Sequence, residues 1–214
     1  MQFLEDIRAS VIDGQWERAE VLTYQALDQA LSPAEILNQA LIPAMDEVGV
    51  RFQNNDFFLP EVLIAAKAMN SAMEVLRPLL ARTEAKPRGK IVIGTVQGDR
   101  HDIGKNLVAM MMEGAGFEVV DLGVDVSPKQ FVEAVAEHRP DIVAMSALLT
   151  TTMPAMRETL RTLEEAGLRE RVKTMIGGAP VGRSFAEEVG ADAYAPDAAS
   201  AVAKMREILR GFEK

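Results

Sequence analysis

From Lys90 onward the sequence alternates between short apolar runs and helical patterns, and this alternation limits the possible folds more than any other feature. The strand-like runs lie at 90–96, 117–122, 141–146, 172–176 and 192–195. The helical patterns lie near 103–115, 128–139, 153–167, 181–190 and 197–211. Five successive strand–helix units predict a doubly wound, flavodoxin-like parallel sheet of five strands, for which we expect the order 2-1-3-4-5.

The preceding residues, 1 to 82, contain helical patterns only. The segment Ser32-Pro33-Ala34-Glu35 has the form of a capping box with proline at the first helical position, so a third helix starts there, and we expect it to bend at Pro43. A last long helix is expected from Phe58 or Pro60 to Ala81. Four amphipathic helices with short connections predict an N-terminal four-helix bundle.

The polar segment 83–89 has no periodicity and contains proline and glycine, which is typical of a linker. The sequence therefore predicts a helical domain over residues 1–82 and a sheet domain over residues 90–214.

Composition excludes several classes of function. A net charge of −9 disfavours nucleic acid as a partner, and the absence of cysteine excludes disulfides, thiolate metal sites and cysteine nucleophiles. No apolar run approaches the roughly 20 residues of a membrane-spanning helix, and the first residues lack the basic start of a signal peptide. We therefore expect a cytoplasmic protein that binds no membrane.

The loop Gly98-Asp99-Arg100-His101-Asp102-Ile103-Gly104 follows the first predicted strand and precedes a helix. Ligands bind at the carboxyl ends of such strands, so a histidine between two aspartates there suggests chemistry. In the expected topology the loop after strand three, residues 146–152, lies beside it and brings a cluster of hydroxyl groups. The alternative is that Asp99 or Asp102 caps the helix and His101 is an exposed loop residue.

Common site chemistries do not fit this loop. A zinc or non-haem iron site needs at least three protein ligands, and the other histidine, His138, lies at the predicted end of a distant helix. The glycines do not match G-x-G-x-x-G, and no serine occupies a G-x-S-x-G turn. The remaining possibility is a cofactor whose macrocycle fills the other coordination positions of its metal, because a single histidine then suffices.

The pattern Asp99-x-His101-x-x-Gly104, followed by Ser146-x-Leu148 and Gly177-Gly178, resembles the corrinoid-binding module of cobalamin-dependent methyltransferases. The segment Phe57-Phe58-Leu59-Pro60-Glu61 resembles their helical cap. The resemblance covers residues 1 to about 210, and the size is similar to that of the free-standing corrinoid proteins of methylamine, methanol or methoxy-compound methyltransferase systems.

This resemblance implies a role for each matched residue. His101 would be the axial ligand of cobalt in cobalamin or a related corrinoid, in place of the nucleotide base. Asp99 would accept a hydrogen bond from the other imidazole nitrogen, and Thr152 would be the hydroxyl member of a proton relay. The other residues of the cofactor site would be Arg100, Asp102, Ile103, Gly104, Ser146, Leu148, Thr150, Gly177 and Gly178.

The glycines and Ser146 also have alternative explanations. Gly104, Gly177 and Gly178 would line a slot for the nucleotide tail, because positions without a side chain let a ligand approach the backbone. Gly177 and Gly178 could instead be ordinary turn glycines. Ser146 could hydrogen-bond the tail or be a satisfied core hydroxyl.

In the cap, Phe57, Phe58, Leu59 and Leu63 resemble a hydrophobic lid over the upper face of cobalt, with Phe58 as the best candidate. The competing interpretation is that the stripe belongs to the bundle core, and we prefer it for Leu63 and Met69. Because a lid must move to admit a partner, the segment 83–89 would be the hinge.

The resemblance implies a methyl carrier rather than a complete enzyme. A substrate-specific methyltransferase would load a methyl group onto cobalt, a second methyltransferase would pass it to coenzyme M or tetrahydrofolate, and a reductive activase would restore the cofactor. A corrinoid-based sensor and regulator, the small subunit of a carbon-skeleton mutase, and a flavodoxin-like domain without cobalt are the alternatives. The sequence leaves the methyl donor and the acceptor open.

Overall fold

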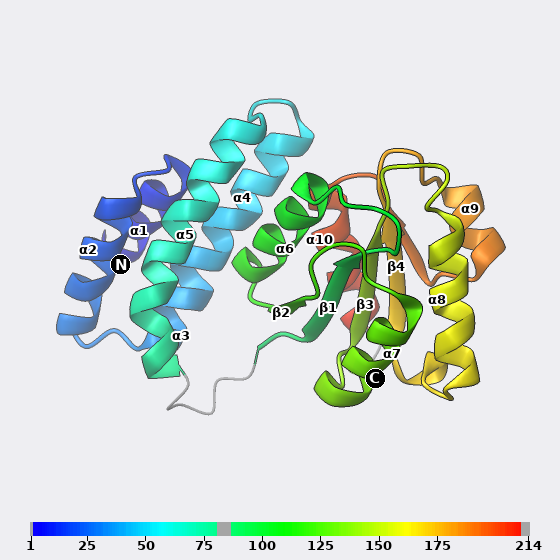
Figure 1. Cartoon of the computed structure of the whole chain (residues 1–214). Coiled ribbons are helices and arrows are strands. Elements are labelled where there is room, and N and C mark those ends of the chain that lie inside the picture. The colour runs from blue at the N-terminus through cyan, green and yellow to red at the C-terminus, as the bar shows by residue number, and fades with distance from the viewer. Residues whose placement is uncertain (1, 81–86, 211–214) are drawn as a thin grey trace. The chain divides into compact units, whose positions relative to one another are not determined.

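The structure is a computed structural model that describes residues 2–80 and 87–210 (Figure 1). The chain divides into two compact units, one formed by Met1–Pro87 with Met110–Gly116 and the other by Arg88–Ala109 with Phe117–Lys214. Most of the predicted linker, residues 83–86, lies outside the described residues, as does Ala81, the predicted end of the last N-terminal helix. The domain limits 1–82 and 90–214 stay a prediction.

The N-terminal part is helical throughout, as predicted. Its α-helices are α1 (Gln2–Ile12), α2 (Trp16–Asp28), α3 (Pro33–Ile36), α4 (Ile42–Gln53) and α5 (Leu59–Leu80). The predicted capping box is present, because the Ser32 hydroxyl accepts from the amide of Glu35 while the Glu35 carboxylate accepts from the amide of Ser32.

The third predicted helix is continuous but changes type on the way. Between α3 and α4 the residues Leu37–Leu41 form a π-helical turn, in which the amide of Ile42 donates to the carbonyl of Leu37, five residues earlier. Pro43 follows directly and has no amide hydrogen to donate. The expected bend at Pro43 stays a prediction, and the structure adds a wider turn just before the proline.

Helix α5 begins at Leu59, where the Glu61 carboxylate accepts from the amide of Phe58 at 2.9 Å. The side chains that α5 buries include Val62, Ala65, Ala66, Met69 and Ala72, spaced by three and four residues. Met69 is 2% exposed, as expected of a core residue. The expectation for Leu63 was wrong: it lies one position off this stripe and is 41% exposed.

The second unit contains the predicted parallel sheet. Its strands are β1 (Lys90–Thr95), β2 (Glu118–Asp121), β3 (Ile142–Ser146), β4 (Lys173–Gly177) and β5 (Ala193–Ala195). They pair in the order β2-β1-β3-β4-β5, every pair parallel, which confirms the predicted topology.

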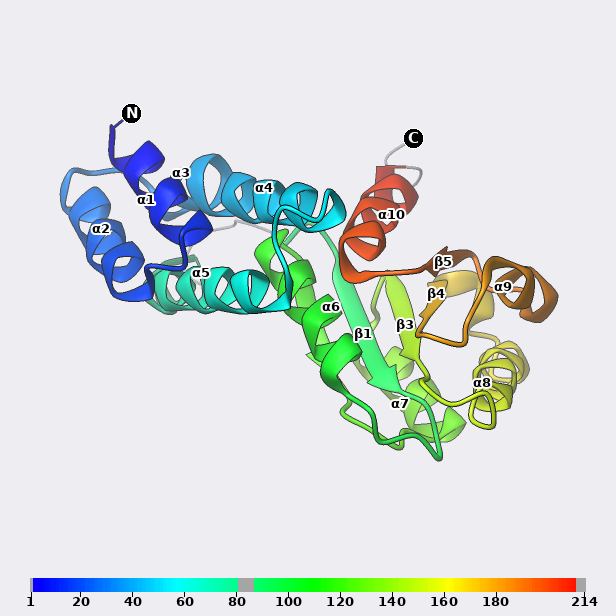
Figure 2. The same cartoon turned by 90° about the horizontal axis from the view of Figure 1, so that it is seen from above.

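The helices that alternate with these strands are α6 (Ile103–Gly114), α7 (Pro128–His138), α8 (Pro154–Glu165), α9 (Arg183–Val189) and α10 (Ala198–Arg210), with a short 3-10 turn at Arg169–Arg171. The residues of α6 from Met110 onward are grouped with the first unit. Figure 2 shows α7, α8 and α9 on one face of the sheet and α10 on the other. The apolar core beneath α7 to α9 includes Val92, Val143 and Ile176 from the strands and Phe131, Met156 and Leu163 from the helices, all fully buried.

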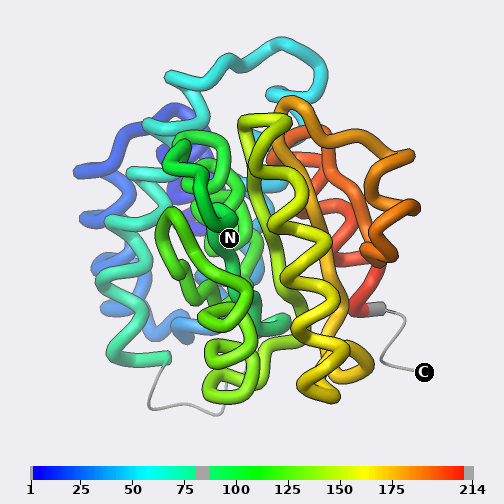
Figure 3. The backbone as a smooth tube through the Cα atoms, turned by 45° about the vertical axis from the view of Figure 1, so that its right-hand side comes forward, coloured from blue at the N-terminus to red at the C-terminus, as the bar shows by residue number. Residues whose placement is uncertain are grey.

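The topology places two loops side by side. Strands β1 and β3 are neighbours, paired from Ile91 with Ile142 to Thr95 with Ser146, although β2 and α7 separate them in the sequence. The loop after β1 and the loop after β3 therefore leave the same edge of the sheet, and Figure 3 shows both at one end of the unit.

Candidate functional site

Asp99 is the centre of the site. It follows β1 and is 0% exposed, whereas the side chain of His101, two residues later, is 52% exposed. The Nδ1 atom of His101 lies 2.7 Å from Oδ1 of Asp99, and the amide of His101 donates to the same oxygen at 3.1 Å. The Thr95 hydroxyl donates to the carbonyl of His101 at 3.0 Å, so three bonds fix this residue.

The other oxygen of Asp99 is bonded by the loop that follows β3. Oδ2 accepts from the amide of Leu148 at 2.7 Å and from the amide of Leu149 at 3.2 Å. The Thr152 hydroxyl, 8% exposed, lies 2.7 Å from the same oxygen and 2.8 Å from the carbonyl of Leu149. The structure thus brings together the three residues Asp99, His101 and Thr152 from two loops that are distant in the sequence.

These contacts set the charge of Asp99. Burial on its own raises the pKa of the carboxyl group, but the hydrogen bonds from the His101 ring, the Leu148 amide, the Thr152 hydroxyl and the His101 amide outweigh it and hold the pKa well below the usual value. Asp99 is therefore an anion at neutral pH. A carboxylate accepts only, so the ring proton of a neutral His101 lies on Nδ1 and the lone pair on Nε2.

The surroundings of His101 fit a corrinoid. Among residues 2–80 and 87–210 none hydrogen-bonds Nε2, so its lone pair is available to a metal. Beside the imidazole, Ile103 is 73% exposed, and Leu148 and Leu149 are 43% and 42% exposed. These residues fit a metal macrocycle: the Nε2 lone pair of His101 would serve as a metal ligand, and the exposed apolar side chains would contact the ring.

The capping alternative is met only through the backbone. The amide of Asn106 donates to the main-chain carbonyl of Asp102 at 2.7 Å, which places Asp102 at the start of α6, but within the described part of the chain no carboxylate oxygen of Asp99 or Asp102 accepts from an amide of this helix. Asp102 is exposed and accepts from the side-chain amide of Asn106 at 3.2 Å. Arg100 and Thr150 are also exposed. The Ser146 hydroxyl is half-buried and makes no hydrogen bond within the described residues, which leaves it available to a ligand.

The three predicted site glycines differ in what surrounds them. A Cβ atom on Gly178, whose φ is +126°, would lie 1.9 Å from the carbonyl oxygen of Ala147, and one on Gly177 would lie 2.8 Å from that of Ala195. Both positions therefore require glycine for the packing of the chain itself. Gly104, at the second position of α6, has no atom within 4 Å of its Cβ position.

Alanine substitutions should separate these two situations. We expect Gly178→Ala to lower the free energy of unfolding by more than about 2 kcal/mol, because both the contact and the φ angle are unfavourable. Gly104→Ala should raise it by about 0.5–1 kcal/mol, because alanine is the better helix former, yet weaken corrinoid binding if this open position receives the cofactor. Denaturant titration of the protein without cofactor and binding of hydroxocobalamin measure the two effects; unchanged binding by Gly104→Ala would remove this glycine from the site.

The predicted cap residues lie in the helical unit. Phe58 is 62% exposed and Leu59 is 36% exposed, and Val50 and Ile64 of the same unit are 55% and 48% exposed. Phe57 lies against the guanidinium of Arg51, 5.1 Å from ring centroid to Cζ. Exposed apolar side chains are consistent with a lid, and the role of Phe58 and Leu59 stays a prediction.

Some groups of the site were not predicted. The amide of Leu149 is one, because a backbone donor carries no signature in its residue type. Thr95, the last residue of β1, and Asp125, in the loop after β2, are two others. Their polar side chains at the carboxyl ends of strands next to the His101 loop were a signal that could have identified them.

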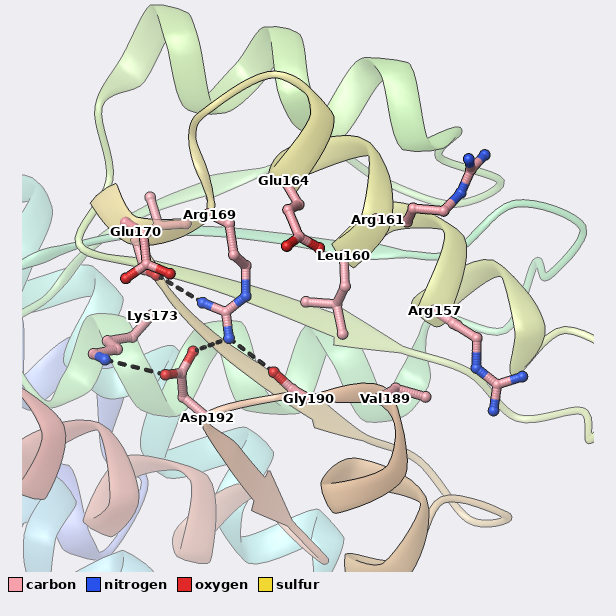
Figure 4. A pocket seen from close by; sticks show the side chains of 11 residues that line it. Arg157, Leu160, Arg161, Glu164, Arg169, Glu170, Lys173, Val189, Gly190 and Asp192 are labelled. Carbon is pink, nitrogen blue, oxygen red and sulfur yellow. Dashed lines mark hydrogen bonds and ion pairs between the residues drawn. The ribbon is translucent and has the colours of Figure 1, made fainter.

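A hollow of about 490 Å³ lies elsewhere, at the amino end of β4. Figure 4 shows Arg169 directed at Asp192 and the carbonyl of Gly190, with Lys173 on the other side of Asp192. Its cations are paired with carboxylates, including Arg157 with Glu188. Because it opens at the opposite end of the strands from His101, it is not part of the candidate site.

Two further findings concern the described residues as a whole. Across residues 2–80 and 87–210, no three or more histidine, aspartate or glutamate side chains gather where they could bind a metal ion. In the same part of the chain, no helix combines the length and the apolar character needed to cross a membrane.

The comparisons with known proteins agree with this geometry. A family model described as B12 binding domain matches residues 89–203, and a second model of the same description matches residues 3–77. Trimethylamine corrinoid protein 1 of Methanosarcina acetivorans is 43% identical over 210 residues, 97% of either chain. Dimethylamine corrinoid protein 1 of the same organism is 49% identical over 180 residues, 84% of either chain.

Solved structures are similar over almost the whole length. A cobalamin-binding protein from Desulfitobacterium hafniense DCB-2 has a TM-score of 0.80 and 34% identity, over 96% of this chain and 98% of that one. A chain of the methanol:cobalamin methyltransferase complex MtaBC from Methanosarcina barkeri has a TM-score of 0.89 and 29% identity, over 98% of this chain and 80% of that one.

Proposed function

The chain belongs to the family of B12-binding corrinoid proteins, and from this premise we propose that it carries methyl groups from a methylamine on the cobalt of a bound corrinoid. The observation that carries the proposal is the bonded set of Asp99, His101 and Thr152 beside an open apolar surface. The near full-length similarity to proteins named for trimethylamine and dimethylamine supports a methylamine as the source of the methyl group.

Each residue of the set has a distinct task. His101 presents the Nε2 lone pair, and Asp99 keeps the proton on Nδ1 and fixes the plane of the ring. Thr152 and the amides of Leu148 and Leu149 hold Asp99 as an anion, so the imidazole stays a strong ligand. A bound corrinoid would supply the cobalt centre that accepts the methyl group and releases it.

The lower ligand can be weakened through the same contacts. A proton added to the His101–Asp99 pair reduces the electron density that the imidazole can donate, so the protonation of the pair and the strength of the ligand change together. Thr152 can donate to Asp99 or to the carbonyl of Leu149, and the choice alters how well the carboxylate is stabilised.

The proposal implies partners in the cytoplasm. A substrate-specific methyltransferase loads the protein, a second methyltransferase unloads it to coenzyme M or tetrahydrofolate, and a reductive activase restores an oxidised cofactor. The similarity to a chain of a methyltransferase complex supports the first of these partners.

The test uses isotopically labelled methyl groups. The protein is loaded with hydroxocobalamin, reduced, and mixed with trimethylamine or dimethylamine labelled in the methyl carbon, with and without the corresponding methyltransferase. We expect the label to co-elute with the protein only when the methyltransferase is present. If the label stays on the amine while a trimethylamine corrinoid protein from Methanosarcina is labelled in parallel, the methylamine assignment is wrong.

A further inference from the structure

The loop between β2 and α7 is hydrogen-bonded to the loop that carries His101. These bonds are separate from the contacts among Asp99, His101 and Thr152. The Oδ1 atom of Asp125 accepts from the amide of Gly98 at 2.7 Å. The amide of Asp125 donates to the carbonyl of Asp99 at 2.9 Å. Asp125 thus hydrogen-bonds the backbone of both Gly98 and Asp99, which lie three and two residues before His101.

Both sides of this contact have an unusual backbone. Gly98 has a φ of +83° and Asp125 a φ of +57°, in the left-handed region that is costly for a residue with a side chain. Aspartate tolerates this region better than most residues, and such a conformation persists only where the surrounding contacts determine it. An unfavourable backbone conformation therefore occurs at the residue that makes two hydrogen bonds to the His101 loop.

Lys105 makes a second connection, between the elements next to these two loops, α6 and β2. It lies in the first turn of α6 and is 2% exposed, an unusual burial for a lysine. Its ammonium group donates to Oδ1 of Asn106 at 2.6 Å and pairs with Asp121, the last residue of β2. Asp121 also accepts from the amide of Gly123 at 2.8 Å, which ties the pair to the loop that carries Asp125.

This position is not one that helix stability alone would favour. A cation in the first turn opposes the helix dipole, and burying it costs solvation free energy that the pairing with Asp121 must offset. The pair fixes a geometry instead. It holds Lys105, in the first turn of α6 and four residues after His101, against the end of β2.

We propose that Asp125 and Lys105 are positioning residues that hold the His101 loop, so that Nε2 is presented to cobalt in one orientation; this inference rests on the proposed function. Asp125 acts on the residues before the imidazole, and Lys105 acts on those after it. Neither side chain contacts the cofactor in this account.

The Asp125 test separates its side chain from its backbone. Asp125→Gly removes the acceptor and keeps the positive φ accessible, whereas Asp125→Asn keeps an acceptor oxygen. The control, Arg139→Gly, makes the same change at the C-cap of α7, where φ is +48°. Each protein is loaded with cyanocobalamin and titrated with cyanide, because a second cyanide must displace the imidazole.

Loss of one hydrogen bond should lower the half-saturating cyanide concentration by about three- to tenfold for Asp125→Gly. Asp125→Asn and Arg139→Gly should behave as the wild type. In the protein without corrinoid, amide hydrogen exchange at Gly98 should be faster in Asp125→Gly, because this amide has lost its acceptor. A cyanide midpoint unchanged in Asp125→Gly, or lowered equally in Asp125→Asn, would overturn the role of Asp125.

Lys105→Met tests the second connection independently, with Lys129→Met on the exposed face of α7 as its control. We expect Lys105→Met to lower the cyanide midpoint by about three- to tenfold and Lys129→Met to leave it unchanged. A lower unfolding temperature of Lys105→Met with an unchanged midpoint would show that the lysine only stabilises the fold. If the wild type itself shows no imidazole ligation, the proposed function fails. If the wild type shows imidazole ligation but Asp125→Gly and Lys105→Met have the same cyanide midpoint as the wild type, only the positioning role fails.

Discussion

Replacing His101 with alanine is expected to abolish imidazole ligation while leaving the protein folded. The ring is half-exposed and its loss removes one of several donors to Asp99, so the free energy of unfolding should fall by no more than about 1–2 kcal/mol. The absorption spectrum of the hydroxocobalamin-loaded protein should change to that of a corrinoid without a histidine ligand. Added imidazole should restore the wild-type spectrum, because the space that the side chain occupied is open to solvent.

The control for this variant is His138→Ala. His138 is the other histidine of the chain and ends α7, which packs on the sheet rather than at its carboxyl edge. Its spectrum should be that of the wild type. If His101→Ala and the wild type have the same spectrum when loaded with the same corrinoid, His101 is not the ligand.

Replacing Asp99 with asparagine should weaken ligation through the tautomer of His101. The side-chain oxygen of the asparagine is best placed where Oδ2 of Asp99 now accepts from Leu148, Leu149 and Thr152. The side-chain NH2 group then faces Nδ1 of His101. Nδ1 must then accept, so the ring proton moves to Nε2 and blocks the atom that should bind cobalt. We expect absorption spectroscopy to show a large loss of imidazole ligation in Asp99→Asn. The control is Asp28→Asn, which makes the same change of charge at the exposed end of α2 and should leave the spectrum as in the wild type.

The same substitution should also change the pH dependence of stability. The folded-state pKa of Asp99 is depressed, so the carboxylate stabilises the fold above the ordinary aspartate pKa near 4, and this stabilisation is lost as the pH falls through the lower folded-state value. Asp99→Asn should therefore be about 2–4 kcal/mol less stable at pH 7, and the difference should shrink in acid. Urea titrations at pH 7 and pH 3 measure it; a difference that grows in acid would contradict the assigned charge.

Much of the fold could be predicted because its signals are local. The alternation after Lys90 determined both the element types and, through the rules for parallel sheets, the strand order. The capping box at Ser32 identified the start of α3. The π-helical turn at Leu37–Leu41 was not predictable from periodicity, because it depends on how the missing amide of Pro43 is accommodated. Leu63 was wrongly expected in the bundle core because it is apolar and adjoins Val62, which does face the core.

For the site, the residues with distinctive side chains could be predicted and the groups that hold them could not. Asp99, His101 and Thr152 have the predicted contacts, because topology brings the loops after β1 and β3 together. The amides of Leu148 and Leu149 depend on the path of the backbone, which residue type does not reveal. Packing against Ala147 requires glycine at position 178 whether or not a ligand is bound, so the place of Gly178 in a ligand slot stays a prediction.

The proposed function requires that His101, rather than the corrinoid's own base, binds cobalt. The most direct test is electron paramagnetic resonance of the cobalt(II) form, using protein in which only histidine is labelled with 15N and the corrinoid is unlabelled. We expect the triplet superhyperfine splitting from an axial 14N to become a doublet in the labelled protein and to be lost in His101→Ala. A triplet that persists in the labelled protein, or no nitrogen splitting in the wild type, would show that His101 is not the ligand.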